Sequence, residues 1–129
     1  MKKFMPILLS ALMLTGCVGK GGGHTRSYRS ISMEEAVKMM AEERDYIILD
    51  VRRPDEFESG HIPNAINIPN EIIGNDEIPE LPNKDQLIMV YCRSGKRSKE
   101  ASEKLVKLGY TNVIEFGGIL DWKGETVTP

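Results

Sequence analysis

Three short segments that read as strands, separated by stretches with helical periodicity, narrow the folds that this chain of 129 residues can adopt. The segments are residues 46–49, 87–91 and 112–116. The first two are continuous apolar runs, which are typical of strands that are buried on both faces. Because helical patterns lie between them, the sequence predicts an α/β fold, with a parallel sheet and helices on both of its faces. In such sheets, ligands bind beyond the carboxyl ends of the strands.

The predicted helices carry recognisable start and stop signals. Ser32 and Glu35 form a capping-box pattern, and apolar residues then recur at helical spacing to about residue 43. Pro54 suits the first turn of a short helix, and Gly109 suits a left-handed stop after a longer one. The other predicted elements are a helix over 54–58, a small strand at 66–68, irregular chain over 70–83, a helix over 98–108, and a turn at Gly117 and Gly118 leading into a short helix that contains Trp122.

The N-terminal segment resembles a bacterial lipoprotein signal peptide. Two lysines precede an apolar stretch over residues 4–14, which is too short to span a bilayer as a mature helix. The sequence Leu-Thr-Gly-Cys that ends at Cys17 resembles the motif in which the cysteine is lipidated and becomes the new N-terminus. We therefore predict a signal peptide at 1–16, a glycine-rich tether at 17–27 that begins with lipidated Cys17, and one domain at 28–129.

This resemblance implies an exported protein that is held at the cell envelope by about two or three acyl chains such as palmitate. Val18 differs from the aspartate that is associated with inner-membrane retention. The predicted location is therefore the outer membrane of a two-membrane bacterium, or otherwise the outer face of the cell membrane. The alternatives are an ordinary signal peptide with a chance cysteine, and a buried N-terminal helix.

The charge balance and the cysteine count exclude several classes of function. The chain has 17 basic and 19 acidic residues, and loss of the signal peptide's two lysines lowers the formal charge from −2 to about −4, which argues against nucleic-acid binding. With Cys17 lipidated, Cys92 is the one remaining thiol, and outside the cytoplasm such a thiol is a liability unless it is buried or used. His24 and His61 stand apart from it in the sequence, so no metal site is predicted.

Cys92 follows the segment 87–91 directly and opens the sequence Cys-Arg-Ser-Gly-Lys-Arg-Ser. A tight turn at Gly95 and a helix that starts near Ser98 would direct several backbone N–H groups inward, which makes a nest for an anion. Such a nest favours the thiolate form of Cys92, and the thiolate is the nucleophile. The sequence therefore predicts a reactive cysteine at the carboxyl end of a strand.

Three cations accompany this cysteine, at Arg93, Lys96 and Arg97. A helix N-terminus already carries partial positive charge, so these residues do not favour the stability of the helix. They would instead attract an anionic substrate to the loop. The alternative is that Cys92 is a small buried apolar residue beside a solvated group of cations.

Three collinear motifs resemble the rhodanese family of sulfurtransferases. Residues 49–69 resemble its N-terminal signature, residues 90–98 its active-site loop and residues 109–122 its C-terminal signature. The resemblance implies a single rhodanese domain with a five-stranded parallel sheet flanked by helices. It also implies that Cys92 takes a sulfane sulfur from an anionic donor of the thiosulfate or polysulfide type, carries it as a persulfide, and passes it to a thiol or to cyanide.

By the same resemblance, the inward N–H groups of the loop stabilise the persulfide, and the reaction requires no metal or organic cofactor. One candidate acceptor is a thioredoxin-like protein. The residues assigned to the loop that binds substrate and persulfide are Arg93, Ser94, Gly95, Lys96, Arg97 and Ser98.

Asp50 and Arg52 follow the first apolar segment and are interpreted as supporting residues that make structural hydrogen bonds between loops. Anion binding by Arg52 is the alternative. His61 is interpreted as a loop histidine with its hydrogen bonds satisfied, and a general base is the alternative there.

The loop length separates two enzyme classes of this fold. Related dual-specificity phosphatases have a loop one residue longer between cysteine and arginine, whereas here four residues separate Cys92 from Arg97, and Ser98 takes the register of the phosphatase arginine. A shorter loop suits one sulfur atom better than a tetrahedral anion, so a cysteine phosphatase or arsenate reductase is the less favoured alternative. A non-catalytic binding module of rhodanese fold is the other, although such modules commonly lack the cysteine.

Overall fold

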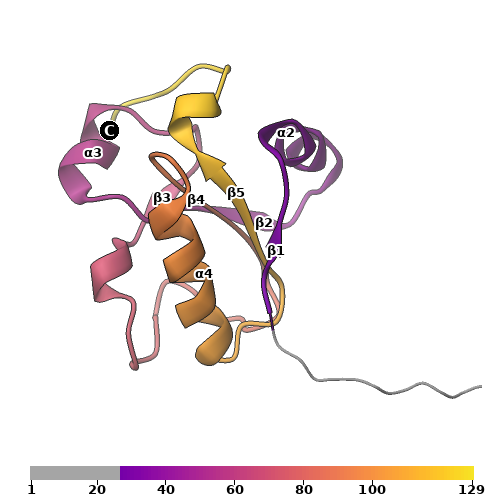
Figure 1. Cartoon of the computed structure of the whole chain (residues 1–129), viewed down its shortest axis with the longest axis vertical. Coiled ribbons are helices and arrows are strands. Elements are labelled where there is room, and N and C mark those ends of the chain that lie inside the picture. The colour runs from indigo at the N-terminus through magenta and orange to yellow at the C-terminus, as the bar shows by residue number, and fades with distance from the viewer. Residues whose placement is uncertain (1–26) are drawn as a thin grey trace, which may run out of the picture.

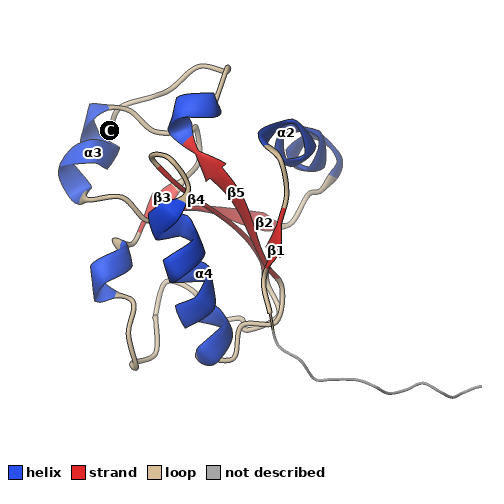
Figure 2. Ribbon diagram, in the orientation of Figure 1, coloured by secondary structure: helices blue, strands red, loops and turns tan. Residues whose placement is uncertain are grey.

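The computed structural model describes residues 27–129, which form one domain around a five-stranded sheet (Figures 1 and 2). The strand order is β1-β5-β4-β2-β3, and every neighbouring pair is parallel. The strands are β1 (Arg29–Ser30), β2 (Tyr46–Asp50), β3 (Ile66–Asn67), β4 (Leu87–Cys92) and β5 (Val113–Gly118). The predicted fold class, an α/β domain with a five-stranded parallel sheet, is confirmed.

Helices cover both faces of this sheet (Figure 1). One face is covered by α4 (Lys96–Lys107), and the short 3-10 helix η3 (Asn70–Ile72) contacts α4. The other face is covered by α2 (Met33–Glu42), and apolar side chains of α3 (Pro54–Ser59) and of the 3-10 helix η4 (Ile119–Asp121) pack against the same cluster. The predicted placement of helices on both faces is therefore confirmed as well.

The central strand β4 is buried on both faces, which is why a short apolar run was sufficient to predict it. Ile88, Val90 and Cys92 belong to the apolar cluster under α4, whereas Met89 and Tyr91 belong to the cluster under α2. All five residues are at most 1 % exposed. Because both faces of the strand are covered, its sequence shows no polar alternation.

The capping box at the start of α2 is confirmed. The backbone N–H of Glu35 donates to Ser32 Oγ, and the backbone N–H of Ser32 donates to Glu35 Oε1, both at 3.0 Å. This reciprocal pair satisfies two N–H groups that a helix start leaves without intrahelical partners. The helix then ends at Glu42, one residue before the predicted limit.

The prediction is wrong in detail near both ends of the described chain. It lacks β1, whose two exposed residues pair in parallel with β5, and whose Ser30 Oγ also donates to Glu115 Oε2. The predicted turn at Gly117 and Gly118 is part of β5 instead, where Gly118 pairs with Cys92, and η4 ends before Trp122. In both cases the conformation is set by a strand that is distant in the sequence.

Within residues 27–129, none of the helices has the length and apolar content that crossing a membrane requires. The predicted signal peptide at 1–16 and the lipidated Cys17 lie outside the described residues.

Candidate active site

Cys92 ends β4, so its side chain lies at the carboxyl edge of the sheet and in the middle of the strand order. The pairing of β4 with β5 shifts register between Val90 and Cys92, and Cys92 then pairs with Gly118. Within residues 27–129 the thiol forms no disulfide, and the residue is only 1 % exposed. The predicted nucleophile therefore lies beneath a loop rather than on the open surface.

The loop turns sharply at Gly95, whose φ of 114° lies in the left-handed region. A residue with a Cβ atom would be strained in this conformation. The turn directs the Gly95 N–H back toward the strand, where it donates to Cys92 Sγ across 3.0 Å. A donor in this position can stabilise an anion on the sulfur through a charge-assisted hydrogen bond. The structure thus supplies one hydrogen bond of the predicted anion nest.

Helix α4 begins at Lys96, earlier than the predicted start near Ser98. Gly95 is the N-cap, and its left-handed backbone allows the helix to begin immediately after the turn. The correction matters for the site because the first N–H groups of a helix have no intrahelical partners. These groups begin directly after the residue that bonds the sulfur, and the helix dipole adds partial positive charge at the same point.

The three predicted cations differ in their environments. Arg93 and Lys96 are exposed, and neither has an ion pair within residues 27–129. Arg97 is half-buried and forms a two-pronged ion pair with Glu56 of α3, with Nη1–Oε1 and Nη2–Oε2 distances of 2.7 and 3.1 Å. Arg97 therefore ties α4 to α3, and Arg93 and Lys96 are the two cations that face solvent.

The ion pair between Arg97 and Glu56 makes a pH-dependent contribution to stability. Hydrogen bonding by Arg97 lowers the pKa of Glu56 from its ordinary value of 4.5 to about 2. A carboxyl group with a lowered pKa stabilises the fold above its ordinary pKa, and this stability is lost as the pH falls toward the lowered value. Because the pair is partly exposed, it contributes less to the free energy of unfolding than the full pKa shift of Glu56 would imply. The expected contribution is roughly 1–2 kcal/mol.

Above pH 4.5, we expect the free energy of unfolding of the wild type to exceed that of Glu56→Gln by this contribution of the ion pair. The difference should vanish as the pH falls to about 2. Urea denaturation of both proteins at a series of pH values measures this difference. The matched control is Glu58→Gln, because Glu58 is an exposed glutamate of the same helix without an ion pair in the described chain. A margin for Glu56→Gln that stays constant across this range would contradict the assignment.

Gly118 presses against the backbone of the Cys92 loop. A Cβ atom at this position would overlap the carbonyl group of Arg93 and would lie 2.5 Å from the Ser94 nitrogen. Two residues further on, the backbone N–H of Leu120 donates to the Arg93 oxygen at 3.2 Å. The end of β5 and the start of η4 therefore hold the first half of the loop in place.

Replacement of Gly118 with alanine is expected to lower the free energy of unfolding by about 1–3 kcal/mol, because the added methyl group overpacks the site. The same clash displaces the loop, so the folded variant should also show slower alkylation of Cys92 by iodoacetamide. Gly74→Ala is the control, since a Cβ at Gly74 meets no atom within 4 Å. Equal stabilities of the two variants would show that the loop tolerates the methyl group.

Asp50 and Arg52 form a buried ion pair at the end of β2, with 2.7 Å between Arg52 Nη2 and Asp50 Oδ2. Asp50 is 0 % exposed, and the same Oδ2 atom accepts a hydrogen bond from the Tyr91 hydroxyl at 2.7 Å. The Tyr91 oxygen in turn accepts from the Ile62 N–H at 3.1 Å, and Arg52 Nη2 donates to the Gly60 oxygen at 2.8 Å. Burial, followed by the charge of Asp50, raises the pKa of Tyr91. These contacts tie β2 to β4 and to the loop over residues 60–62.

His61 is buried in this loop. Its ring stacks on Phe57 with 3.6 Å between ring centroids, and its Nδ1 atom lies 2.9 Å from the Phe57 oxygen. Its backbone forms a two-way bridge with Val127, at 2.9 Å in each direction. His61 thus has structural partners through both its ring and its backbone.

Four residues that the sequence interpretation did not assign to the site belong to the surroundings of Cys92: Glu56, Tyr91, Glu115 and Gly118. Glu115 had a usable signal, because it is the one charged residue in the predicted strand at 112–116. The structure shows Glu115 buried, at 2 % exposure. Glu56 had no such signal, since an acidic residue in a short exposed helix is common.

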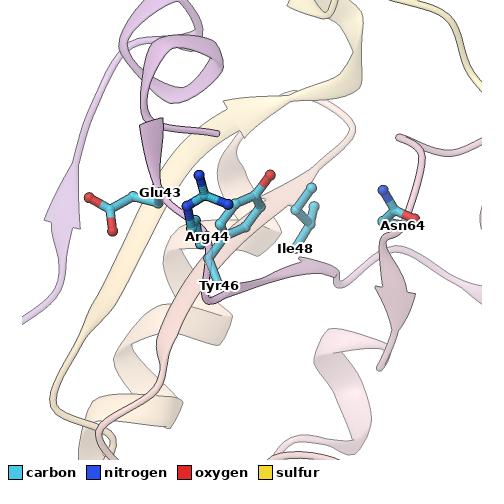
Figure 3. A pocket seen from close by; sticks show the side chains of 5 residues that line it. All are labelled: Glu43, Arg44, Tyr46, Ile48 and Asn64. Carbon is cyan, nitrogen blue, oxygen red and sulfur yellow. The ribbon is translucent and has the colours of Figure 1, made fainter. Parts of the chain in front are cut away.

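Two pockets of the described chain lie outside the Cys92 loop. Figure 3 shows one of about 450 Å³, lined by residues that lie toward the amino end of β2: Glu43, Arg44, Tyr46, Ile48 and Asn64. The other, of about 740 Å³, lies between the start of α2 and η4 and includes Leu120, so it adjoins the loop that Leu120 contacts. Within residues 27–129, no cluster of three or more histidine, cysteine or acidic side chains could hold a metal ion.

Comparison with known proteins gives one consistent result. A family model described as "Rhodanese-like domain" matches residues 32–125. A sulfurtransferase from Allochromatium vinosum is 37 % identical over 93 residues, which cover 71 % of this chain and 85 % of that protein. Thiosulfate sulfurtransferase PspE from Escherichia coli is 37 % identical over 73 residues, or 57 % of this chain and 70 % of that protein.

A solved structure gives the same result for the fold. The crystal structure of a rhodanese-related protein from Thermoplasma volcanium superposes with a TM-score of 0.65 and 34 % identity. The superposition covers 79 % of this chain and 100 % of that one.

Proposed function

The chain belongs to the rhodanese-like domain family and is a sulfurtransferase, and we propose that it transfers sulfane sulfur through a persulfide on Cys92. The observation that carries the proposal is the 3.0 Å hydrogen bond from the Gly95 N–H to Cys92 Sγ. It places a donor at the atom that becomes charged, in a loop that is fixed before the reaction begins. The similarity to proteins named sulfurtransferase and thiosulfate sulfurtransferase supports the same reading.

In the first half-reaction, the Cys92 thiolate attacks the outer sulfur of an anionic donor such as thiosulfate or a polysulfide. A new S–S bond forms on Cys92 while the S–S bond of the donor breaks, and with thiosulfate the leaving sulfite takes the bonding electron pair. Cys92 then carries a persulfide anion. The charge moves outward by one sulfur atom, toward the first turn of α4, whose N–H groups and dipole favour an anion.

In the second half-reaction, cyanide or an acceptor thiolate attacks the terminal sulfur of the persulfide. The S–S bond to Cys92 breaks, thiocyanate or an acceptor persulfide leaves, and the Cys92 thiolate is restored. Atoms and charge balance in both steps without an external oxidant or reductant. Cys92 supplies the nucleophile, and the loop supplies the electrostatic stabilisation.

Arg93 and Lys96 are suited to draw the donor toward the loop, because both are exposed cations beside Cys92. The loop residues Ser94 and Gly95 and the first residues of α4, Arg97 and Ser98, would shape the space for the sulfur atom. Arg97 would act through its ion pair with Glu56 rather than by holding the donor directly. This division of roles differs from the expectation that all three cations recruit the substrate.

The test uses the full-length protein with Cys17 replaced by serine, so that Cys92 is the one thiol. The protein is incubated with thiosulfate, its intact mass is measured, and cyanide is then added. A gain of one sulfur atom that disappears on addition of cyanide, with release of thiocyanate, is the expected result. No gain with thiosulfate or polysulfide would refute the proposal and favour a non-catalytic binding module. Cys92-dependent hydrolysis of an aryl phosphate would favour a phosphatase instead.

A lipid anchor at Cys17 is the second part of the proposal, and it rests on the signal-peptide pattern alone. It would hold the domain at the cell envelope through the tether at 17–27. Incorporation of labelled palmitate into the wild-type protein, and none into Cys17→Ser, is the expected result in a bacterial host. Equal labelling of both proteins would contradict it. A thiol acceptor in this setting would be a protein such as a thioredoxin-like one, or a small thiol.

A further inference from the structure

Glu115 is a buried carboxylate that lies behind the Cys92 loop. It stands in β5, opposite Ser30 of β1 in the pairing register, and its side chain is 2 % exposed. Burying a carboxylate in a protein core is unfavourable unless several donors satisfy it. Neither of the proposed sulfur-transfer steps uses Glu115. The burial of its carboxylate beside the Cys92 loop therefore suggests a structural role at that loop.

The two oxygens of Glu115 face different parts of the fold. Oε2 accepts a hydrogen bond from Ser30 Oγ at 2.8 Å, on the side of the edge strand. Oε1 accepts from Ser98 Oγ at 2.9 Å and from the Gly117 N–H at 2.8 Å, on the side of the loop. Lys99 Nζ lies 3.6 Å from the same oxygen and is the charged partner of the carboxylate. One carboxylate thus joins β1, the end of β5 and the first turn of α4.

A short chain of contacts runs from this carboxylate to the reactive sulfur. Ser98 Oγ, which contacts Glu115, also lies 2.8 Å from the Gly95 oxygen and 3.3 Å from the Gly117 oxygen, so its one hydroxyl proton is shared among three acceptors. Gly95 in turn donates its N–H to Cys92 Sγ. Ser98 is 0 % exposed, so solvent does not compete for these contacts. The orientation of Gly95 therefore depends on Ser98, and the orientation of Ser98 on Glu115.

The geometry points to Glu115 as a positioning residue for Cys92. It fixes Ser98 and the Gly117 backbone, and through them it holds the Gly95 N–H in line with the sulfur. This role rests on the proposed function, because the same N–H group would stabilise the thiolate and the persulfide. The Gly95 oxygen also accepts the Lys99 N–H at 3.3 Å, so Ser98 and Glu115 add their contacts to a turn that the helix already holds, and such fixed positioning of a donor is what preorganised stabilisation of charge requires.

The test compares three variants that act on the loop, Glu115→Ala, Glu115→Gln and Ser98→Ala, with the matched control Ser30→Ala. All are made in the full-length Cys17→Ser protein and studied where circular dichroism shows them folded. Ser30→Ala removes the partner of Oε2 and leaves the contacts of Oε1 intact. The first measurement is the alkylation rate of Cys92 by iodoacetamide as a function of pH. The second is the single-turnover rate of sulfur loading from thiosulfate.

Glu115→Ala and Ser98→Ala are expected to slow both sulfur loading and the alkylation of Cys92 at neutral pH by about tenfold, which matches the usual contribution of a hydrogen bond to a charged atom. Glu115→Gln keeps an acceptor oxygen for Ser98 and Gly117, so it should restore both values. Ser30→Ala should stay within about twofold of the parent protein in both measurements, whatever it costs in stability.

If folded Glu115→Ala and Ser98→Ala match Ser30→Ala in both measurements, Glu115 only stabilises the fold and the inference is wrong. If the parent protein loads no sulfur, the proposed function fails, and the alkylation profile still decides the role of Glu115 because it needs no sulfur donor. Should Glu115→Ala fail to fold, Ser98→Ala removes a single hydroxyl group and gives the same comparison.

Discussion

Replacement of Cys92 with serine is expected to abolish sulfur loading and to lower the rate of thiocyanate formation from thiosulfate and cyanide by at least about a thousandfold. A serine hydroxyl in the same loop remains protonated at neutral pH, and oxygen does not form the S–S bond that carries the sulfur. The substitution changes one atom of a side chain that is 1 % exposed, so the fold should persist. The measurement is the initial rate of thiocyanate formation.

The Cys17→Ser protein is the control for this prediction, because it loses the other cysteine of the chain and keeps Cys92. It should form thiocyanate at the wild-type rate. Residual activity of Cys92→Ser above about one per cent of the parent would place the sulfur carrier elsewhere and would overturn the mechanism.

The largest expected loss of stability follows replacement of Asp50 with alanine. This change leaves the Arg52 guanidinium without its carboxylate partner and the Tyr91 hydroxyl without its acceptor, in a site where Asp50 is 0 % and Arg52 5 % exposed. Removing one partner of a buried ion pair costs about 3–5 kcal/mol in the free energy of unfolding. Urea denaturation followed by circular dichroism measures the loss.

The chain contains its own matched control for this experiment. Asp55 pairs with Arg53 at 3.1 Å with the same spacing of two residues, but the side chains are 70 % and 59 % exposed. Solvent screens such a pair, so Asp55→Ala should leave the stability nearly unchanged. Comparable losses for the two variants would mean that burial does not set the strength of the Asp50–Arg52 pair.

The sequence predicts those elements whose signals are local. The buried runs that became β2 and β4, and the capping box of α2, are readable because apolar periodicity and cap chemistry act over a few residues. The edge strand β1 has no such signal. Its two exposed residues become a strand only because β5, more than eighty residues away along the chain, offers free backbone groups for pairing.

The same distinction applies to the site. The candidate nucleophile Cys92 and the turn at Gly95 follow from seven consecutive residues, and the sequence interpretation places both at the carboxyl end of β4. The partners that fix the loop come from elsewhere: Glu56 is 41 residues from Arg97, and Glu115 is 17 from Ser98. Three neighbouring cations gave no indication that one of them is tied to a distant carboxylate. The start of α4 was misplaced because a glycine can be a left-handed N-cap as well as part of a looser turn.

The common direction of all five strands gives the domain two unlike ends (Figure 1). The described chain enters at Ser27, next to the amino end of β1, whereas Cys92 lies at the carboxyl end of β4. A lipidated Cys17 would therefore hold the domain by the end opposite to its reactive sulfur. The point of attachment would then be distant from the proposed catalytic edge, so an anchor at Cys17 would leave that edge accessible to dissolved donors and partner proteins.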